Sequence, residues 1–378
     1  MKKILLILTL LLFTSTPALA LEDPLSVPNN KIGIHILFTT ELDDAAQLVN
    51  GNNGDWGYVL IPIQSGDKDL KKWQEFMDKA KEKHLIPIIR LATEGDYFNT
   101  HVWRKPDETD ILDFANFLNS LEWPTKNRYV IVFNEVNRGD EWGGEANPAE
   151  YAQLLSYAVT VFKSINQDFF MISSGMDNAA PNQGSTYINQ YSFFDRMNGE
   201  VPGIFNQVDG LASHSYPNPG FSQPPSVVSS SSIVSFYFER KFIQKMSSKS
   251  HPIFITETGW SNEKISDKDR ASYYMDALSN AWSDKGIVAI TPFILRASGP
   301  FAKFSFMTED GNPTEQYQAI KNMIKIKGQP ILSPEVLSVV TQANTTTLVK
   351  SFSSEDKPKS KISLSKALQS TFKWLMKI

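Results

Sequence analysis

Two glutamates that each end an apolar run are the residues best suited to chemistry in this sequence. Five apolar residues, Tyr129–Phe133, and Asn134 precede Glu135, and the run Pro252–Thr256 precedes Glu257. Such runs predict strands buried on both faces, as in parallel sheets covered by helices. A carboxyl group at the end of a buried strand lies at the edge of a core, where burial can raise its pKa and make it a proton donor. Either glutamate alone is better interpreted as a solvated loop residue, but the pair favours a functional site.

The elements that must position these glutamates alternate between strand-like and helix-like segments from Lys31 to about Ile326. This rhythm predicts an α/β fold, a (β/α)8 TIM barrel with a short C-terminal extension. The expected strands are Lys31–Phe38, Gly57–Ile63, Leu85–Leu91, Arg128–Asn134, Asp168–Ser173, Gln207–His214, Pro252–Thr256 and Ile287–Leu295. A doubly wound open sheet is the alternative, ranked lower because no glycine-rich phosphate turn follows the first strand. In a barrel all strands end at one rim, which would bring Glu135 and Glu257 together.

Two of the expected helices begin with the same short motif. Asn147–Pro148 and Asn312–Pro313 each place an asparagine before a proline, with a glutamate three residues after the asparagine. Asparagine is a good N-cap and proline suits the first helical position. We therefore expect helices capped by Asn147 and by Asn312.

Segments of different character flank the barrel, which is expected over residues 21–327. Residues 1–20 have the order of a secretory signal peptide, with cleavage near Ala20, so we expect a secreted, extracellular or periplasmic protein without a transmembrane helix. Residues 328–378 are a C-terminal extension, in which Leu364, Leu368, Phe372 and Leu375 would line one side of an amphipathic helix surrounded by lysines. Peripheral contact with a membrane or wall polymer is one interpretation, and docking on the barrel or fraying is the favoured one.

Composition excludes several classes of chemistry. A formal net charge of -4 gives no reason to expect nucleic acid as a partner. With no cysteine, the chain has no disulfide, thiolate metal site or cysteine nucleophile. The histidines form neither an HxH pair on the first strand nor a His-Glu-x-x-His motif, and no Gly-x-Ser-x-Gly elbow occurs. We expect no metal and no cofactor.

The two strand-end motifs also carry a resemblance. Phe133–Asn134–Glu135 on the fourth expected strand and Thr256–Trp260 on the seventh resemble the clan of retaining glycoside hydrolases on (β/α)8 barrels. The resemblance covers Lys31 to about Ile326 and does not identify the family within the clan. It implies that Glu135 is the acid/base, held partly protonated, and that Glu257 is the ionised nucleophile. The two carboxyl groups would then lie about 5–5.5 Å apart.

Further residues are candidates for substrate binding at the same rim. The resemblance assigns Asn134 to the sugar 2-hydroxyl, and it matches His214 and Tyr216 to a His-x-Tyr after the sixth strand, with the tyrosine hydroxyl near the nucleophile. Arg90 ends the third strand and would hold Glu257 ionised or pair with another acid at the rim. His35 on the first strand is a rim or core residue, with the core favoured.

Aromatic residues near the rim are candidates for stacking on sugar rings, because an indole combines apolar area with a polar edge. Trp142 and Trp260 lie nearest the catalytic motifs and are preferred over Trp56 and Trp103. The clan commonly has a tryptophan at the end of the eighth strand, where this chain has Phe293, and the loop at 296–303 is expected to supply a substitute.

These observations predict a secreted retaining glycoside hydrolase that cleaves β-linked poly- or oligosaccharides, with carbohydrate as its partner and no cofactor. A non-catalytic carbohydrate-binding barrel is the alternative from another class. The missing tryptophan on the eighth strand is the feature that favours it.

Overall fold

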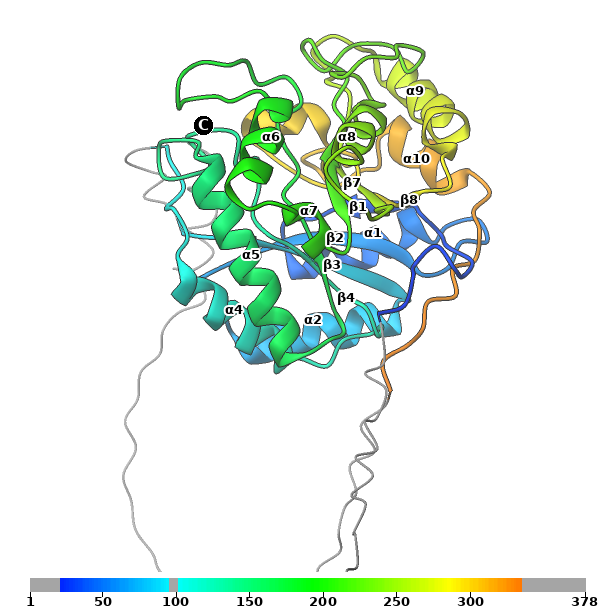
Figure 1. The fold of residues 1–378 in the computed structure, drawn as a ribbon. Coiled ribbons are helices and arrows are strands. Elements are labelled where there is room, and N and C mark those ends of the chain that lie inside the picture. Colours follow the sequence, from blue (N-terminus) through cyan, green and yellow to red (C-terminus); the bar gives the residue numbers. More distant parts are fainter. Residues whose placement is uncertain (1–20, 95–100, 335–378) are drawn as a thin grey trace, which may run out of the picture.

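The structure is a computed structural model that describes residues 21–94 and 101–334 (Figure 1). The expected signal peptide and the expected amphipathic helix near the C-terminus lie outside these ranges. Among the helices in the two ranges, none has both the length and the apolar character needed to cross a membrane.

Parallel strands form the centre of the molecule. In the described ranges they are β1 (Gly33–His35), β2 (Gly57–Gln64), β3 (Leu85–Ala92), β4 (Arg128–Ile131), β5 (Phe169–Ile172), β6 (Leu211–His214), β7 (Ile253–Glu257) and β8 (Ile287–Ile290). β1 to β5 pair in order in one sheet and β6 to β8 in another. Parallel bridges between Ile172 and Gly210 and between Ile32 and Ile290 join the two sheets at both edges. The sheets therefore close into a (β/α)8 barrel, and the predicted fold is confirmed.

Helices surround the barrel and cover the outer faces of its strands (Figure 1). They are η1 (Thr39–Glu41), α1 (Leu42–Val49), α2 (Leu70–Glu82), α4 (Glu108–Asn119), α5 (Pro148–Ile165), α6 (Gln190–Glu200), α7 (Ile204–Gln207), α8 (Ser235–Ile243), α9 (Asp267–Ser279), η2 (Ala281–Ser283), η3 (Gly299–Phe304) and α10 (Glu315–Asn322). Asn147 caps α5 as predicted, since its side chain accepts hydrogen bonds from the N–H groups of Ala149 and Glu150.

The predicted cap of the last helix is wrong. Thr314, not Asn312, caps α10, and its hydroxyl oxygen accepts a hydrogen bond from the N–H of Tyr317. The same hydroxyl donates to the carbonyl of Phe306 at 2.8 Å. This long-range bond fixes the start of the helix, and it leaves Asn312 in the preceding turn.

Apolar side chains form two layers, one inside the barrel and one between strands and helices. Tyr58 and Leu60 of β2 face the barrel interior, whereas Val59 and Ile61 belong to the layer beneath the helices. This alternation follows from the two-residue period of a strand. A packed interior of this kind leaves the strand ends as the place for a site.

Candidate active site

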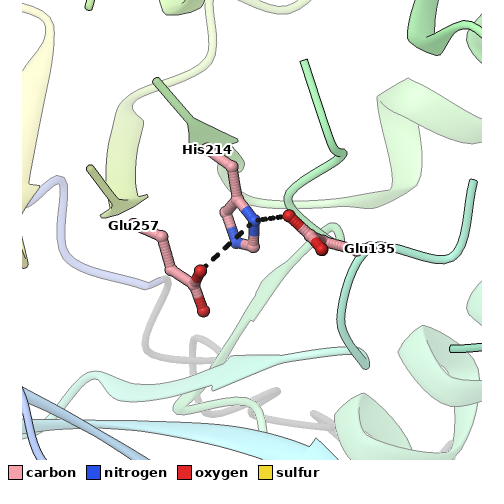
Figure 2. A group of neighbouring side chains, drawn as sticks. All are labelled: Glu135, His214 and Glu257. Atoms are coloured by element: carbon pink, nitrogen blue, oxygen red, sulfur yellow. Dashed lines mark hydrogen bonds and ion pairs between the residues drawn. The ribbon is translucent and has the colours of Figure 1, made fainter. Parts of the chain in front are cut away.

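The residues expected to form a site meet at the C-terminal end of the barrel. His35, His214 and Glu257 are the last residues of β1, β6 and β7, and Glu135 follows β4. Figure 2 shows the imidazole of His214 between the carboxyl groups of Glu135 and Glu257. One ligand atom from each of these three side chains lies within 4.8 Å of the others.

A sharp turn after β4 places Glu135 in the site. The strand ends at Ile131, earlier than predicted, and the backbone of Phe133 and of Glu135 adopts positive φ angles of 67° and 36°. Positive φ is unfavourable for residues other than glycine, and such strain is common at functional sites. The N–H of Glu135 donates to the carbonyl of Gly175 at 3.0 Å, which holds the strained turn against the segment after β5.

Two cationic groups bind the carboxylate of Glu135. His214 Nδ1 donates to its Oε1 at 2.9 Å, and Arg138 Nη1 donates to its Oε2 at 3.0 Å. Burial raises the pKa of Glu135, but the His214 hydrogen bond and the Arg138 charge outweigh burial and hold this pKa below its usual value. The expectation that the free protein holds Glu135 partly protonated is therefore wrong. The charges of His214 and Arg138, which the sequence did not reveal, decide the direction in which the pKa of Glu135 shifts.

The same carboxylates act on the pKa of His214 in the opposite direction. Burial lowers the pKa of His214, but the charges of Glu257 and Glu135 outweigh burial and raise it above the usual value. The ring packs so closely on the backbone at Gly175 that a Cβ there would lie 2.5 Å from Nε2. His214 is thus positioned by a glycine on one side and by Glu135 on the other.

Arg90 and Tyr216 bind the carboxylate of Glu257. Arg90 Nη1 donates to Oε1 at 2.6 Å, and the hydroxyl of Tyr216 donates to Oε2 at 3.0 Å. Arg90 Nη1 also donates to Oδ1 of Asn134 at 2.7 Å. Charge-assisted hydrogen bonds of this kind fix the position of a carboxylate. Arg90 therefore pairs with Glu257 rather than with another acid at the rim.

His35 and Phe293 lie beside Glu257. His35 is fully buried, and its Nδ1 is 3.7 Å from Oε1 of Glu257. Within the described residues neither ring nitrogen has a hydrogen-bond partner, and burial followed by the charge of Arg90 lowers the pKa of His35 well below its usual value. Phe293 meets the ring of His35 edge-on at 5.1 Å, and Phe301 of η3 lies 5.4 Å from Phe293. The loop at 296–303 thus supplies an aromatic neighbour to Phe293.

The two preferred tryptophans do not face the site. Trp142 is 1% exposed and packs against Phe133 and Tyr151, and Trp260 is 0% exposed and packs against Tyr274. The expectation that these indoles stack on sugar is therefore wrong, because both belong to the layer between strands and helices. Each instead anchors the loop after its strand.

The other two tryptophans lie at opposite ends of the barrel. Trp56 precedes β2 and stacks on His84, at the end away from the site. Trp103 is half-buried, and its backbone N–H donates at 2.8 Å to the carbonyl of Asp140 in the loop after β4. Trp103 is therefore the tryptophan at the rim.

Three charged residues near Glu135 were not among the candidates. Arg138 binds Glu135 and also Asp140, at 2.7 Å. Burial and the charge of Glu135 raise the pKa of the half-buried Glu141 to about 8. Burial also raises the pKa of Asp177, which follows β5. Arg138 and Glu141 come a few residues after Glu135, a charged run that could have signalled them, whereas no local pattern marks Asp177.

The distances among Glu135, His214 and Glu257 would suit a metal ion. However, Arg138 and Arg90 already donate to the two carboxylates. A metal cation at this place would have to displace guanidinium groups or lie against them, at a high electrostatic cost. We therefore assign no metal to the site.

Comparisons with known proteins identify a family for the chain. The sequence matches the family model described as "glycosyl hydrolase catalytic core" over residues 100–319, more than half of the chain. No curated protein matches the sequence.

Solved structures with a similar fold come from several glycoside hydrolase families. A family 39 glycoside hydrolase from Bacteroides cellulosilyticus WH2 has a TM-score of 0.55 at 15% identity, over 81% of this chain and 65% of that one, slightly under two thirds of its length. Thermotoga maritima Cel5A in complex with mannotriose has a TM-score of 0.52 at 12% identity, over 79% of this chain and 100% of that one. A GH128 endo-β-1,3-glucanase from Sorangium cellulosum has a TM-score of 0.51 at 15% identity, over 77% of this chain and 97% of that one. At these identities the similarity establishes the fold alone.

Proposed function

Because the chain belongs to the glycosyl hydrolase catalytic core family, we propose that it is a secreted retaining glycosidase that hydrolyses β-linked poly- or oligosaccharides by double displacement. The observation that carries this proposal is the separation of the two carboxylates. Oxygens of Glu135 and Glu257 lie within 4.8 Å of each other. Retaining enzymes place their carboxyl groups about 5–5.5 Å apart, whereas inverting enzymes need about 6.5–9.5 Å to admit a water molecule.

In the first step Glu257 acts as the nucleophile. An oxygen of its carboxylate attacks the anomeric carbon while the bond from that carbon to the leaving oxygen breaks, and Glu135 protonates the leaving oxygen. Since the free protein keeps Glu135 charged, the proton must reach it before or during this step. The imidazolium of His214 holds a proton 2.9 Å from Oε1 of Glu135 and is the nearest source.

In the second step water hydrolyses the glycosyl ester of Glu257. Glu135 now acts as the base and takes a proton from the water, which attacks the anomeric carbon and releases the carboxylate of Glu257. The negative charge of Glu257 raises the pKa of Glu135. Esterification removes that charge and so lowers the pKa of Glu135. Glu135 is therefore deprotonated when a base is needed.

Several neighbouring residues would bind the sugar. Asn134 uses its Oδ1 for Arg90, which leaves its Nδ2 for the 2-hydroxyl of the sugar. His35 is fully buried beside Glu257 and would support the wall of the site next to that carboxylate. Phe293 offers an apolar surface next to His35. Tyr216 keeps Glu257 oriented toward the anomeric carbon.

The preference for β-linked substrates draws support from the similar structures. One of them is described as an endo-β-1,3-glucanase. Export draws support from the sequence of residues 1–20, which has the order of a signal peptide.

Hydrolysis of a panel of aryl β-glycosides and β-glucan and β-mannan oligosaccharides tests the proposal. The wild type should release product with the anomeric configuration retained, and Glu257→Ala should lower the rate to background. Glu135→Ala should lose about 10²–10⁴-fold with poor leaving groups and less with good ones, and azide should restore its rate. Glu309→Ala, at an exposed position, is the control and should match the wild type.

Each outcome discriminates between the proposed activity and its alternative. Binding of glycans without turnover in the wild type would favour the non-catalytic barrel. Inversion of configuration would contradict the nucleophilic role of Glu257, and failure of azide rescue would contradict the acid/base role of Glu135.

A further inference from the structure

Hydroxyl side chains flank both functional residues on β6 and β7. Ser213 and Ser215 lie on either side of His214, and Thr256 and Thr258 on either side of Glu257. Because side chains alternate along a strand, these hydroxyls point away from the face that carries His214 and Glu257. All four residues are buried.

The hydroxyls of β7 bind the backbone of β6. Thr258 Oγ1 donates to the carbonyl of Ser215 at 2.7 Å, and Thr256 Oγ1 contacts the carbonyl of Ser213 at 3.5 Å. The register of the two strands shifts by a bulge between Ser213 and His214, which brings His214 opposite Glu257. The threonines therefore maintain the strand register on which the site depends.

A chain of buried hydroxyls connects β6 to Glu239 of α8. Ser235 Oγ donates to Ser215 Oγ at 3.1 Å, and the N–H of Phe236 donates to the same oxygen at 3.3 Å. Ser215 and Ser213 are 2.9 Å apart, and Ser213 Oγ donates to Oε1 of Glu239 at 3.0 Å. Since Ser215 already accepts twice, its own proton is best placed on Ser213. The chain then runs in one direction and ends on the carboxyl group of Glu239.

Few neighbouring groups could neutralise a negative charge on the carboxyl group of Glu239. Glu239 is only 4% exposed, and burial raises its pKa to about 7, against the hydrogen bond from Ser213. The titratable groups that face it are His214 on β6 and Tyr191 on α6. Arg240, next to it on α8, is instead bonded to Asp284. Near neutral pH this carboxyl group is therefore able to gain or lose a proton.

We propose that Glu239 is a positioning residue whose protonation state controls how readily His214 passes its proton to Glu135. This inference rests on the proposed function for its effect on turnover. With a neutral Glu239, the imidazolium of His214 is attracted to Glu135 and Glu257 alone. An ionised Glu239 adds a negative charge on the opposite side of β6. This charge competes with Glu135 for the imidazolium, so His214 holds its proton more tightly. Proton delivery to Glu135 then becomes slower.

The pH dependence of turnover tests this role. Glu239→Gln keeps an acceptor for Ser213 but never ionises. The alkaline limb of the kcat profile should therefore move to higher pH. At pH 5.5, about 1.5 units below pH 7, kcat and KM should stay close to wild type. Glu239→Leu removes the end of the hydroxyl chain, and kcat should fall at every pH. Glu309→Gln, at an exposed position, is the matched control. An unchanged alkaline limb in Glu239→Gln would overturn the proposal even if Glu239→Leu fails to fold.

A second measurement is independent of activity. The imidazole of His214 can be titrated by NMR, with the spectrum of His214→Gln used to assign its signals. Loss of the negative charge in Glu239→Gln should move the His214 midpoint to lower pH. An unchanged midpoint would reduce Glu239 to a structural role. A shifted midpoint in a protein that hydrolyses no glycan would uphold the coupling while contradicting the proposed function.

Discussion

Every oxygen of the two facing carboxylates has a donor in the structure. Glu135 lies between His214 and Arg138, and Glu257 lies between Arg90 and Tyr216. Fixed partners of this kind hold reacting groups in place before substrate arrives, which lowers the entropic cost of reaching the transition state. The same partners keep Glu135 charged, so they make its acid role dependent on the proton of His214.

Removal of the Tyr216 hydroxyl should weaken the control of Glu257. A hydrogen bond to a charged group contributes about 1.5–3 kcal/mol, so Tyr216→Phe should lower kcat by roughly 10- to 150-fold. KM should change little, because the hydroxyl is hydrogen-bonded to Glu257. Steady-state kinetics with an aryl β-glycoside measures the effect, and Tyr237→Phe on the exposed side of α8 is the control. Wild-type kcat in Tyr216→Phe would contradict the positioning role.

Removal of the Arg138 charge should change the pH profile. Arg138 contributes to the low pKa of Glu135, so Arg138→Gln should raise that pKa. The protonated form needed in the first step would then persist to higher pH, and the alkaline limb of kcat/KM should move upward. Arg196→Gln, at an exposed position, should leave the profile as it is. A downward shift in Arg138→Gln would show that another group sets this limb.

At the scale of elements, one strand and one loop segment position His214. β6 carries it, the bulge before it turns it toward Glu257, and the segment after β5 presents Gly175 to its ring. A glycine is required at this place because of the close approach rather than because of its backbone angles. The segment after β5 is thus part of the site, although it contributes no side chain at Gly175.

Gly175→Ala should displace His214 without unfolding the barrel. The added Cβ would lie 2.5 Å from Nε2, so the ring must leave its present position and lose its hydrogen-bond geometry to Glu135. A misplacement of about 1 Å can lower a rate by about 100-fold, and we expect a fall in kcat of this size. Gly199→Ala is the matched control, because a Cβ on that α6 residue meets nothing within 4 Å and alanine favours helix. Equal kcat in both variants would contradict this account of His214, and circular dichroism checks that both fold.

Sequence patterns predicted elements well where local chemistry decides and poorly where distant contacts do. Asn147 caps α5 because the capping bonds are all local. Thr314 replaces Asn312 because its bond to Phe306 is not visible in a short window of sequence. Trp142 and Trp260 are near the motifs in sequence but pack in the layer beneath the helices, because sequence distance does not determine on which side of a strand the following loop packs.

At the scale of the whole molecule, barrel closure brings Glu135 and Glu257 together from distant segments. Counting strands was sufficient to predict this meeting, because all strands of a barrel end at one rim. The contact of Tyr216 with Glu257 was implied by the resemblance to the clan, and the structure contains it. The order of the strands does not predict the charge state of Glu135, because that charge depends on Arg138 and His214, which approach it from different directions.

The opposite end of the barrel yields a prediction about where the folded unit ends. Residues beyond the expected boundary at 327 bind this end of the barrel. Gly328 N–H donates to Asp55, Gln329 N–H to Pro28, and the N–H of Lys126 to Ile331. Ser333 adds bonds to Pro124 and Thr125. Gly328, Pro330 and Ile331 of this segment line a pocket together with Trp56 and Tyr129.

Truncation should therefore distinguish two boundaries. A chain that ends at Lys327 loses these bonds, each worth about 0.5–1.5 kcal/mol, and its Tm should fall by roughly 5 °C or more. A chain that ends at Pro334 keeps them, and we expect its Tm to stay near that of residues 21–378. Differential scanning calorimetry of the three proteins measures the effect. A shared Tm for all three would place the boundary at 327, whereas a fall already at 334 would mean that residues 335–378 stabilise the barrel.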